Sequence, residues 1–253
     1  MPIMLAKGLL AGIIVGFVTA SIRSWVDRFF LVILLISLLK FPIQEAITIN
    51  LIVVSLAVLM NALRQADVLM AVREDWPLVI IPASLGAMVG RVIGLEAPAR
   101  VLLVLLGVYA ILAGIRMLVV RPLPEEESPA HPGWLAPMAS LAALVTGLLS
   151  AGAKAFLVPY YNIALGRHPR QAYALAALSV SVAAPTALAT QITLGHFLSP
   201  AHILWSVYLF VVIISVSFLV ERYWTPRLNK IVTFTVAPLL ILVGIRFLWL
   251  IWR

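Results

Sequence analysis

The chain alternates long apolar runs with short breaks that contain charged residues, proline or glycine. Residues 29–39 contain no charged residue, and residues 101–120 contain only Arg116. Because a helix needs about 20 mostly apolar residues to cross a membrane, such runs predict membrane-embedded helices. The predicted segments are 5–22, 25–39, 46–63, 76–94, 101–120, 135–153, 155–166, 171–194, 203–220 and 231–252. The pattern therefore predicts an all-α polytopic membrane protein.

One polar stretch divides these segments into two groups. Residues 121–133 hold three of the ten acidic residues and four prolines, a composition typical of linkers. We therefore predict a first transmembrane repeat at 1–120, a polar Pro/Glu linker at 121–134 and a second transmembrane repeat at 135–253. Local similarities at an offset of about 130 residues agree with this division, since Gly114-Ile115-Arg116 recurs as Gly244-Ile245-Arg246.

Each half opens with a segment whose length does not fit a single crossing. Residues 7–39 would form a helix of roughly 50 Å, too long for a hydrocarbon core of about 30 Å, whereas residues 29–39 alone are too short. After the linker, residues 150–154 interrupt the apolar run and Pro159 follows. We therefore predict two homologous halves of about four segments each. Each half opens with a broken helix or a re-entrant hairpin, and the halves are inverted repeats.

The composition excludes several classes of protein. Hydrophobic residues make up 63% of the chain and charged residues 11%, against about 25% charged in soluble domains, which excludes a water-soluble globule. The chain has no cysteine and its four histidines form no metal set, so no metal and no cofactor are predicted. The net charge of +8 is scattered over helix ends, which argues against a nucleic-acid partner.

Two basic residues, Arg23 and Lys154, occupy matching positions at the interruptions of the two halves. A cation within the apolar thickness costs at least about 2.5–3.5 kcal/mol, so such residues usually face a cavity or a partner. We predict that both bind an anionic substrate, aided by the N-termini of half-helices. The alternative is pairing of Arg23 with Asp27, or extension of either side chain to the interface. Lys154 has no acidic residue nearby in sequence.

Four uncharged polar residues extend this predicted substrate-binding site. Ser21 and Ser150 lie beside the interruptions, where their hydroxyls would complete an oxyanion-binding shell. Asn50 and Gln191 are amides within otherwise apolar spans, and an amide in lipid must find a partner. Packing or hydrogen bonding between helices is the alternative role for all four.

The acidic residues fall in the linker, in a loop containing Asp67, Glu74 and Asp75, or near helix ends, and none lies in the middle of a span. Since proton and sodium pumps typically use buried carboxylates, this distribution favours an anion pathway. The chain contains no Walker loop, dinucleotide fingerprint, HExxH or GxSxG motif. We therefore predict no catalytic residues and no enzymatic activity.

A motif run in the second half comprises Gly147–Gly152, Phe156–Pro159, the polar turn Gly166–Ala172 and Gly195-His196. This run resembles the TauE/SafE sulfite exporter family, also called TSUP. The resemblance implies a doubled layout and transport of small sulfur-containing anions such as sulfite, sulfonates or thiosulfate. Typical members have a glycine-rich GxGGG turn before the Val-Pro pair, whereas this chain has Ala-Gly-Ala-Lys-Ala at residues 151–155.

These features predict a secondary transporter of the inner (plasma) membrane that moves sulfite, thiosulfate or an organosulfonate by alternating access. An interior-negative potential would assist export of the anion. A passive anion channel and a non-transport membrane-embedded subunit are the alternatives. Membrane lipid is a further expected partner, and a homo-oligomer is left open. The positive-inside rule places both termini outside the cytoplasm, with the linker cytoplasmic if the halves are inverted.

Overall fold

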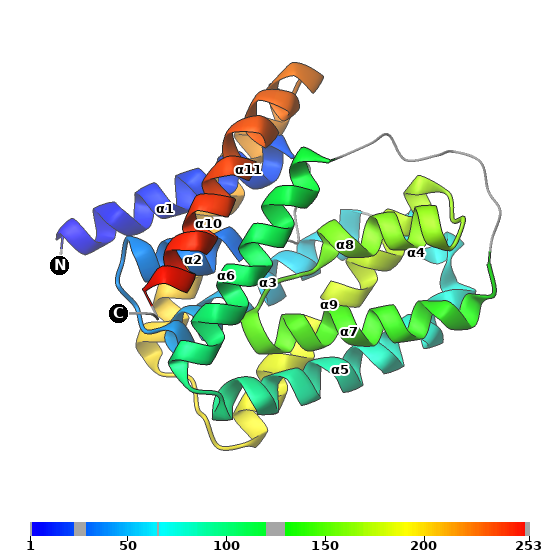
Figure 1. Ribbon diagram of the computed structural model, residues 1–253, viewed down its shortest axis with the longest axis horizontal. Coiled ribbons are helices and arrows are strands. Elements are labelled where there is room, and N and C mark those ends of the chain that lie inside the picture. The colour runs from blue at the N-terminus through cyan, green and yellow to red at the C-terminus, as the bar shows by residue number, and fades with distance from the viewer. Residues whose placement is uncertain (1, 23–28, 65, 120–129, 251–253) are drawn as a thin grey trace.

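The computed structural model describes residues 2–22, 29–64, 66–119 and 130–250, and their regular structure is entirely helical (Figure 1). The elements are α1 (Pro2–Ser21), α2 (Phe29–Ser37), α3 (Ile43–Arg64), α4 (Ala66–Ala71), η1 (Arg73–Asp75), α5 (Trp76–Glu96), α6 (Ala99–Leu118), η2 (Pro132–Trp134), α7 (Leu135–Leu149), α8 (Lys154–Pro159), η3 (Tyr160–Ala164), α9 (Pro169–Thr193), α10 (Pro200–Arg222) and α11 (Pro226–Trp249). Seven helical stretches in the described ranges are long and apolar enough to cross a membrane. The prediction of an all-α polytopic membrane protein is confirmed.

Local sequence explains where the last long helices begin. α10 and α11 each start with a proline, whose fixed φ suits the first helical position and whose missing N–H would be unsatisfied there anyway. The preceding side chains cap the exposed amides: Ser199 Oγ accepts from the His202 N–H at 3.2 Å, and Thr225 Oγ1 accepts from the Leu228 N–H at 3.1 Å. Short polar connections therefore separate long apolar helices.

The second half opens with a hairpin formed by α7 and α8, which we call the second hairpin. The Ala130 N–H, just before η2, donates to the Leu165 carbonyl oxygen, just after η3, at 3.1 Å. The chain therefore runs along α7 in one direction and returns along α8 and η3 to the end of the molecule at which α7 begins. α7 ends at Leu149, four residues before the end of the predicted segment 135–153, because Ser150 leaves the helical conformation. The chain then turns at residues 150–153, within the predicted interruption.

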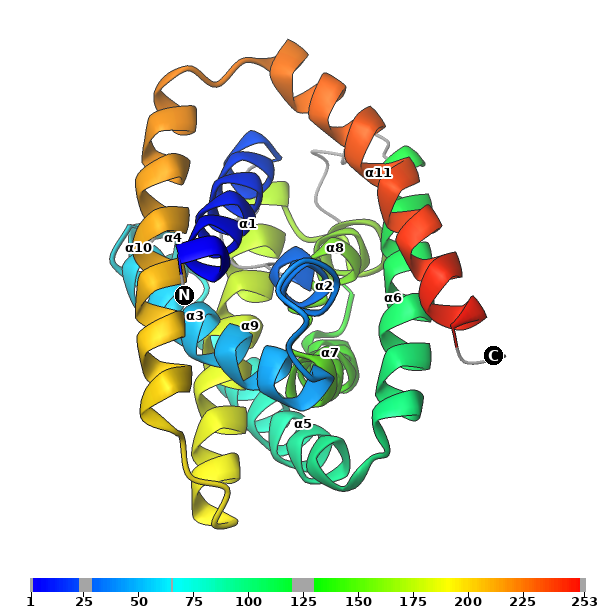
Figure 2. The ribbon, with the colours of Figure 1, turned by 90° about the vertical axis from the view of Figure 1, so that its left-hand side faces the viewer.

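The first half opens with the first hairpin, formed by α1 and α2. Tyr208 Oη donates to the Leu5 carbonyl oxygen at 3.0 Å, and the Tyr208 ring contacts Trp205, which in turn contacts Phe41 after α2. The start of α1 and the residues after α2 therefore meet near the start of α10. In Figure 2, α2 and α8 lie near the middle of the outline, with α9 and α10 on one side and α6 and α11 on the other.

Rows of glycine at every fourth residue bring each hairpin against a long helix. Gly86, Gly90 and Gly94 of α5 lie against the backbone of α7. Gly8 and Gly12 of α1 lie against side chains of α10, and Gly16 lies against the Ile213 carbonyl oxygen and the Val216 side chain. Small residues at this spacing let helices pack closely in a membrane. The α5–α7 and α1–α10 pairs thus fix the hairpins in the bundle.

Helices α6 and α11 run antiparallel to each other. A Cβ on Gly107 would lie 3.0 Å from the Gly244 carbonyl oxygen, and one on Gly114 would lie 2.7 Å from the Ala237 carbonyl oxygen. At the offset of about 130 residues, Gly107 corresponds to Ala237 and Gly114 to Gly244. If each residue is replaced by its counterpart in the other half, the Gly107–Gly244 contact becomes the Gly114–Ala237 contact, as expected for a pair of helices related by two-fold symmetry.

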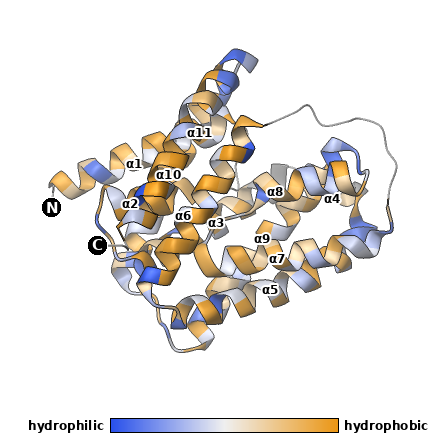
Figure 3. Ribbon diagram, viewed as in Figure 1, coloured by the Kyte–Doolittle hydropathy of each residue, from blue (hydrophilic) through white to orange (hydrophobic). Residues whose placement is uncertain are grey.

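Polar residues gather at the helix ends, with apolar residues along the helices (Figure 3). The connection expected to be a loop around Asp67 and Asp75 instead contains the short helices α4 and η1. Arg167 Nη2 lies 3.0 Å from Asp75 Oδ1, so an ion pair ties η1 to the turn before α9. This contact anchors the open end of the second hairpin.

Candidate functional site

The turn of the second hairpin has an unusual backbone. Ser150 and Ala153 have φ angles of 54° and 43°, a left-handed conformation that residues other than glycine rarely adopt. The Ser150 N–H donates to the Thr146 carbonyl oxygen at 2.8 Å, and Thr146 Oγ1 lies 3.1 Å from the Ala151 carbonyl oxygen. Such conformations cost free energy and often occur at functional sites, so the interruption predicted from sequence is a candidate binding element.

Asn50 of α3 is fully buried against this turn. Its Nδ2 donates to the Ser150 carbonyl oxygen at 2.9 Å and lies 3.0 Å from Ser150 Oγ. Its Oδ1 is also buried and accepts no hydrogen bond within the described part of the chain. The fold therefore brings together two predicted site residues 100 positions apart, and Asn50 positions the turn while keeping a spare acceptor.

Lys154 is the first residue of α8 and is only 6% exposed. Its Nζ lies 5.3 Å from the centroid of the Tyr173 ring on α9, within cation–π distance. The predicted cation is therefore buried beside the turn of the second hairpin.

At the first hairpin, α1 ends at Ser21, which is fully buried. Its Oγ has no hydrogen-bond partner among the described residues, and its carbonyl oxygen accepts from Trp224 Nε1 at 2.9 Å. Trp224 lies in the α10–α11 connection, so this end is capped from a loop. Arg23 lies outside the described residues.

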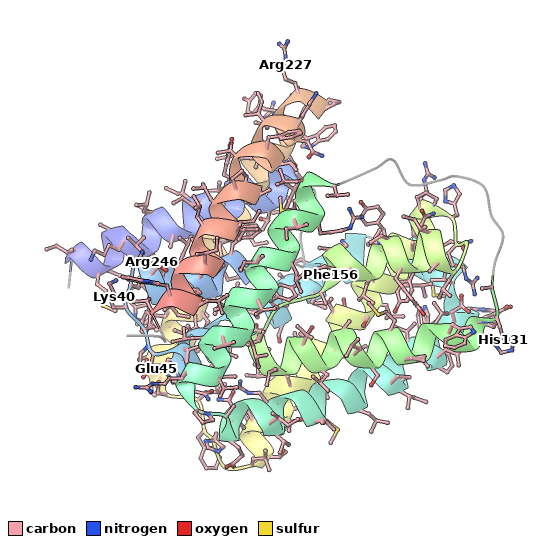
Figure 4. The ribbon with its side chains drawn as sticks, in the orientation of Figure 1. Lys40, Glu45, His131, Phe156, Arg227 and Arg246 are labelled. Atoms are coloured by element: carbon pink, nitrogen blue, oxygen red, sulfur yellow. The ribbon has the colours of Figure 1, made fainter. Side chains whose placement is uncertain are left out.

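A row of aromatic rings joins the two hairpins. Phe29, the first residue of α2, makes an edge contact with Tyr109 of α6 at 5.2 Å between ring centroids. Tyr109 makes a second edge contact with Phe156 of α8 at 5.7 Å. Figure 4 places Phe156 in the interior, between α8 and α6. Since both phenylalanines lie near the first residues of their short helices, the starts of α2 and α8 approach each other across Tyr109.

Arg91 of α5 is a functional candidate that the sequence analysis did not single out. It is completely buried, and its Nε donates to Gln191 Oε1 at 3.1 Å while its Nη2 donates to Thr48 Oγ1 at 3.1 Å and to Gln191 Oε1. By sequence it lay near the end of a span, where a basic side chain normally extends to the interface. The signal that could have identified it is its place between Gly90 and Gly94, in a row of small residues that predicts close packing.

Gln191 therefore does not reach the turn of the second hairpin. It bonds to Arg91, whereas Asn50 bonds to Ser150. Thr48 and Asn50, two residues apart on α3, each contact one of these clusters. The predicted site is thus divided into two adjoining clusters on opposite sides of α3.

Both clusters are closed in this conformation. A shallow groove of about 390 Å³ lies between α5 and α9, lined by Met88, Val89, Val92, Ile93, Thr190, Thr193 and Leu194. It contains no charged residue and so offers nothing to hold an anion. In the described ranges, no group of three or more His, Cys, Asp or Glu could hold a metal ion.

Comparison with known protein families gives a single assignment. The model of the family described as "Sulfite exporter TauE/SafE" matches residues 4–247. No curated protein and no solved structure matches the chain. The match covers both hairpins and both clusters of the candidate site.

Proposed function

Because the chain belongs to the TauE/SafE sulfite exporter family, we propose that it is a secondary transporter that moves a small sulfur oxyanion by alternating access between its two hairpins. The observation that carries this proposal is the approach of the starts of α2 and α8 across Tyr109, with Lys154 buried as the first residue of α8. Interrupted segments that meet inside a bundle are a common substrate site in secondary transporters.

The residues at the second turn suit a sulfur oxyanion chemically. Lys154 supplies positive charge, which an anion needs once it leaves water. Ser150 and Asn50 supply short polar groups beside it, and the left-handed backbone directs the turn away from helical hydrogen bonding. We assign Lys154, Ser150 and Asn50 to substrate binding, with Ser21 and Arg23 as the corresponding contribution of the first hairpin.

We also propose that residues 1–120 and 135–253 are inverted repeats. Two features support inversion: the antiparallel α6–α11 pair with exchangeable contacts, and two hairpins that begin at opposite ends of the molecule, as Figure 1 displays for α1 and α7. The positive-inside rule then favours cytoplasmic placement of the end that carries Arg73, Arg167 and Arg227. Both termini and the α9–α10 connection lie outside the cytoplasm in this arrangement.

The test is transport by the purified protein in liposomes. Liposomes loaded with sulfite, thiosulfate or sulfoacetate are diluted into anion-free buffer, and efflux is measured with and without the same anion outside. A carrier working by alternating access accelerates exchange when substrate is present on both sides, and this countertransport is the expected result. Conductance without countertransport would identify a passive anion channel instead. No flux of any of the three anions would refute the proposal.

A further inference from the structure

Arg91 is the largest fully buried side chain of the described residues, and its charge is not matched by a protein charge among them. No carboxylate in the described ranges lies within 4.0 Å of its nitrogens. Its Nη1 is buried and has no hydrogen-bond partner in the part of the chain that the structure describes. A buried charge is costly unless it is paired, so the position calls for an anion that the described chain does not provide.

The neighbours of Arg91 orient it without neutralising it. Gln191 accepts hydrogen bonds from Nε and Nη2 through one amide oxygen, and Thr48 accepts another from Nη2. Thr48 Oγ1 in turn lies 2.9 Å from the Gln44 carbonyl oxygen, and Gln44 Nε2 donates to the Gly94 carbonyl oxygen at 2.7 Å. These partners are all uncharged. They hold one side of the guanidinium and leave the two N–H groups of Nη1 unused.

The α5 backbone at Arg91 also packs against the arm of the second hairpin that leads to the proposed substrate site. A Cβ on Gly147 would come within 2.8 Å of the Arg91 backbone nitrogen, and Gly147 precedes the turn at Ser150 by less than one helical turn. Close packing beside a glycine does not itself require an arginine. In the matching α1–α10 contact, the residues beside Gly16 are Ile213 and Val216, both apolar.

We propose that Arg91 is a second anion-binding residue, whose Nη1 receives an oxygen of the transported sulfur oxyanion, with Gln191 and Thr48 as positioning residues. This inference rests on the proposed function and adds a residue to its site. A guanidinium presents paired N–H donors to an oxyanion and stays charged when buried, which suits it to this role better than lysine. The anion reaches Arg91 when the crossing of α3, α5 and α9 opens during the transport cycle.

The experiment places a carboxylate on the chain where the anion's charge is needed. Gln191→Glu keeps the side-chain shape and puts a fixed negative charge on the atom that already bonds to Arg91. Arg91→Met removes the positive charge, and Arg100→Met makes the same change at an exposed arginine as a matched control. Thermal melting of each full-length protein is followed against sulfite concentration, with sodium chloride holding ionic strength constant.

We expect sulfite to raise the melting temperature of the wild type and of Arg100→Met equally. Gln191→Glu should melt higher than the wild type without sulfite, because its carboxylate pairs with Arg91, and should lose the sulfite-dependent shift. Arg91→Met should bind sulfite about 10–100-fold more weakly, the loss typical of a charged hydrogen bond. If Gln191→Glu does not fold, the sulfite affinity of Arg91→Met tests the inference by itself.

Two outcomes would overturn the inference. An undiminished sulfite shift in Gln191→Glu or Arg91→Met would mean that Arg91 only ties the three helices together. Absence of a shift in the wild type with sulfite, thiosulfate and sulfoacetate would remove the proposed function, and the inference with it. The first outcome leaves the proposed function standing, so the two failures are distinguishable.

Discussion

Helix α5 supports the second hairpin in the way that α10 supports the first, but the two contacts differ in stiffness. A Cβ on Gly90 would lie 2.1 Å from the Leu144 carbonyl oxygen, so α5 and α7 touch backbone to backbone. In the α1–α10 contact, only Gly16 meets backbone, since a Cβ there would lie 2.7 Å from the Ile213 carbonyl oxygen, whereas a Cβ on Gly12 would lie 2.7 Å from Val212 Cγ1, a side-chain atom that can move. The second hairpin is therefore held by the more rigid of the two contacts.

The residues beside the glycines differ as well. Arg91 stands next to Gly147 near the turn of the second hairpin, whereas Val216 stands next to Gly16 in the first. Arg91 belongs to the rigid contact through its backbone, and its side chain bonds to Gln191 of α9 and Thr48 of α3. The comparison shows that one packing arrangement can carry charged groups in one place and remain apolar in the other. The hydrogen bonds of Arg91 to Gln191 and Thr48 keep the buried guanidinium oriented.

The largest expected effect comes from alanine at Gly90. Its methyl group would meet a backbone oxygen that no rotamer change can move, so Gly90→Ala should yield no monodisperse protein in size-exclusion chromatography. Gly12→Ala should cost about 1–3 kcal/mol, the usual range for overpacking where side chains give way. The double variant Gly12→Ala with Val212→Ala should recover wild-type melting. Equal yields of the two single variants would remove the difference in stiffness.

The next largest effect concerns transport at the second hairpin. Lys154→Met should reduce sulfite flux in liposomes to the level of empty liposomes, because the anion loses a buried counter-charge at the turn. The protein should still elute as a folded species, since methionine fills the volume of the lysine stem. Lys230→Met makes the same change at an exposed lysine and should keep wild-type flux. Full flux in Lys154→Met would exclude that residue from the site.

Much of this fold follows from the sequence because apolar length and charge distribution dictate it. Ten apolar segments, the membrane class and the interruption at Ser150 all follow from where polar residues are tolerated in lipid. The end of α7 was predicted four residues too late, since hydropathy does not register a left-handed serine among apolar residues. The short helices around Asp67 and Asp75 were expected to be a loop, because polar composition alone does not separate a short helix from a loop.

The candidate site could be predicted only in part. Lys154 and Ser150 were identified because they interrupt an apolar run, which is visible along the chain. The hydrogen bonds between Asn50 and Ser150 and between Arg91 and Gln191 each join residues 100 positions apart. They form only because of the way in which the helices cross. A single sequence does not reveal such crossings, so both substrate contact and hydrogen bonding between helices were left open for Gln191, and Arg91 was not singled out.

A smaller effect would sharpen the comparison of the two turns. Asn50→Leu leaves the buried Ser150 carbonyl oxygen without its donor, which should cost about 1–3 kcal/mol and lower sulfite flux. Trp224→Phe removes the donor to the Ser21 carbonyl oxygen from a partly exposed loop, where water can take its place, and should cost about 0.5–1.5 kcal/mol with flux retained. Thermal melting and liposome flux of both variants provide the measurement. A larger loss of melting temperature and flux in Trp224→Phe than in Asn50→Leu would mean that the end of α1 contributes more to stability and transport than the turn of the second hairpin does.

The smallest perturbation tests whether the two hairpins enter from opposite sides of the membrane. The chain has no cysteine, so a single one can be placed at His131, before α7, or at Phe197, in the α9–α10 connection. Both positions are exposed, and His131 lies at the opposite end of the molecule from Lys40 in Figure 4. On intact cells, a membrane-impermeant thiol reagent should label Phe197→Cys and spare His131→Cys, which should react only after permeabilisation. Labelling of both from outside would refute inversion, because parallel halves would start on the same side of the membrane. Labelling of His131→Cys alone would keep the halves inverted but place both termini in the cytoplasm, so the basic residues around Arg73 and Arg167 would lie outside.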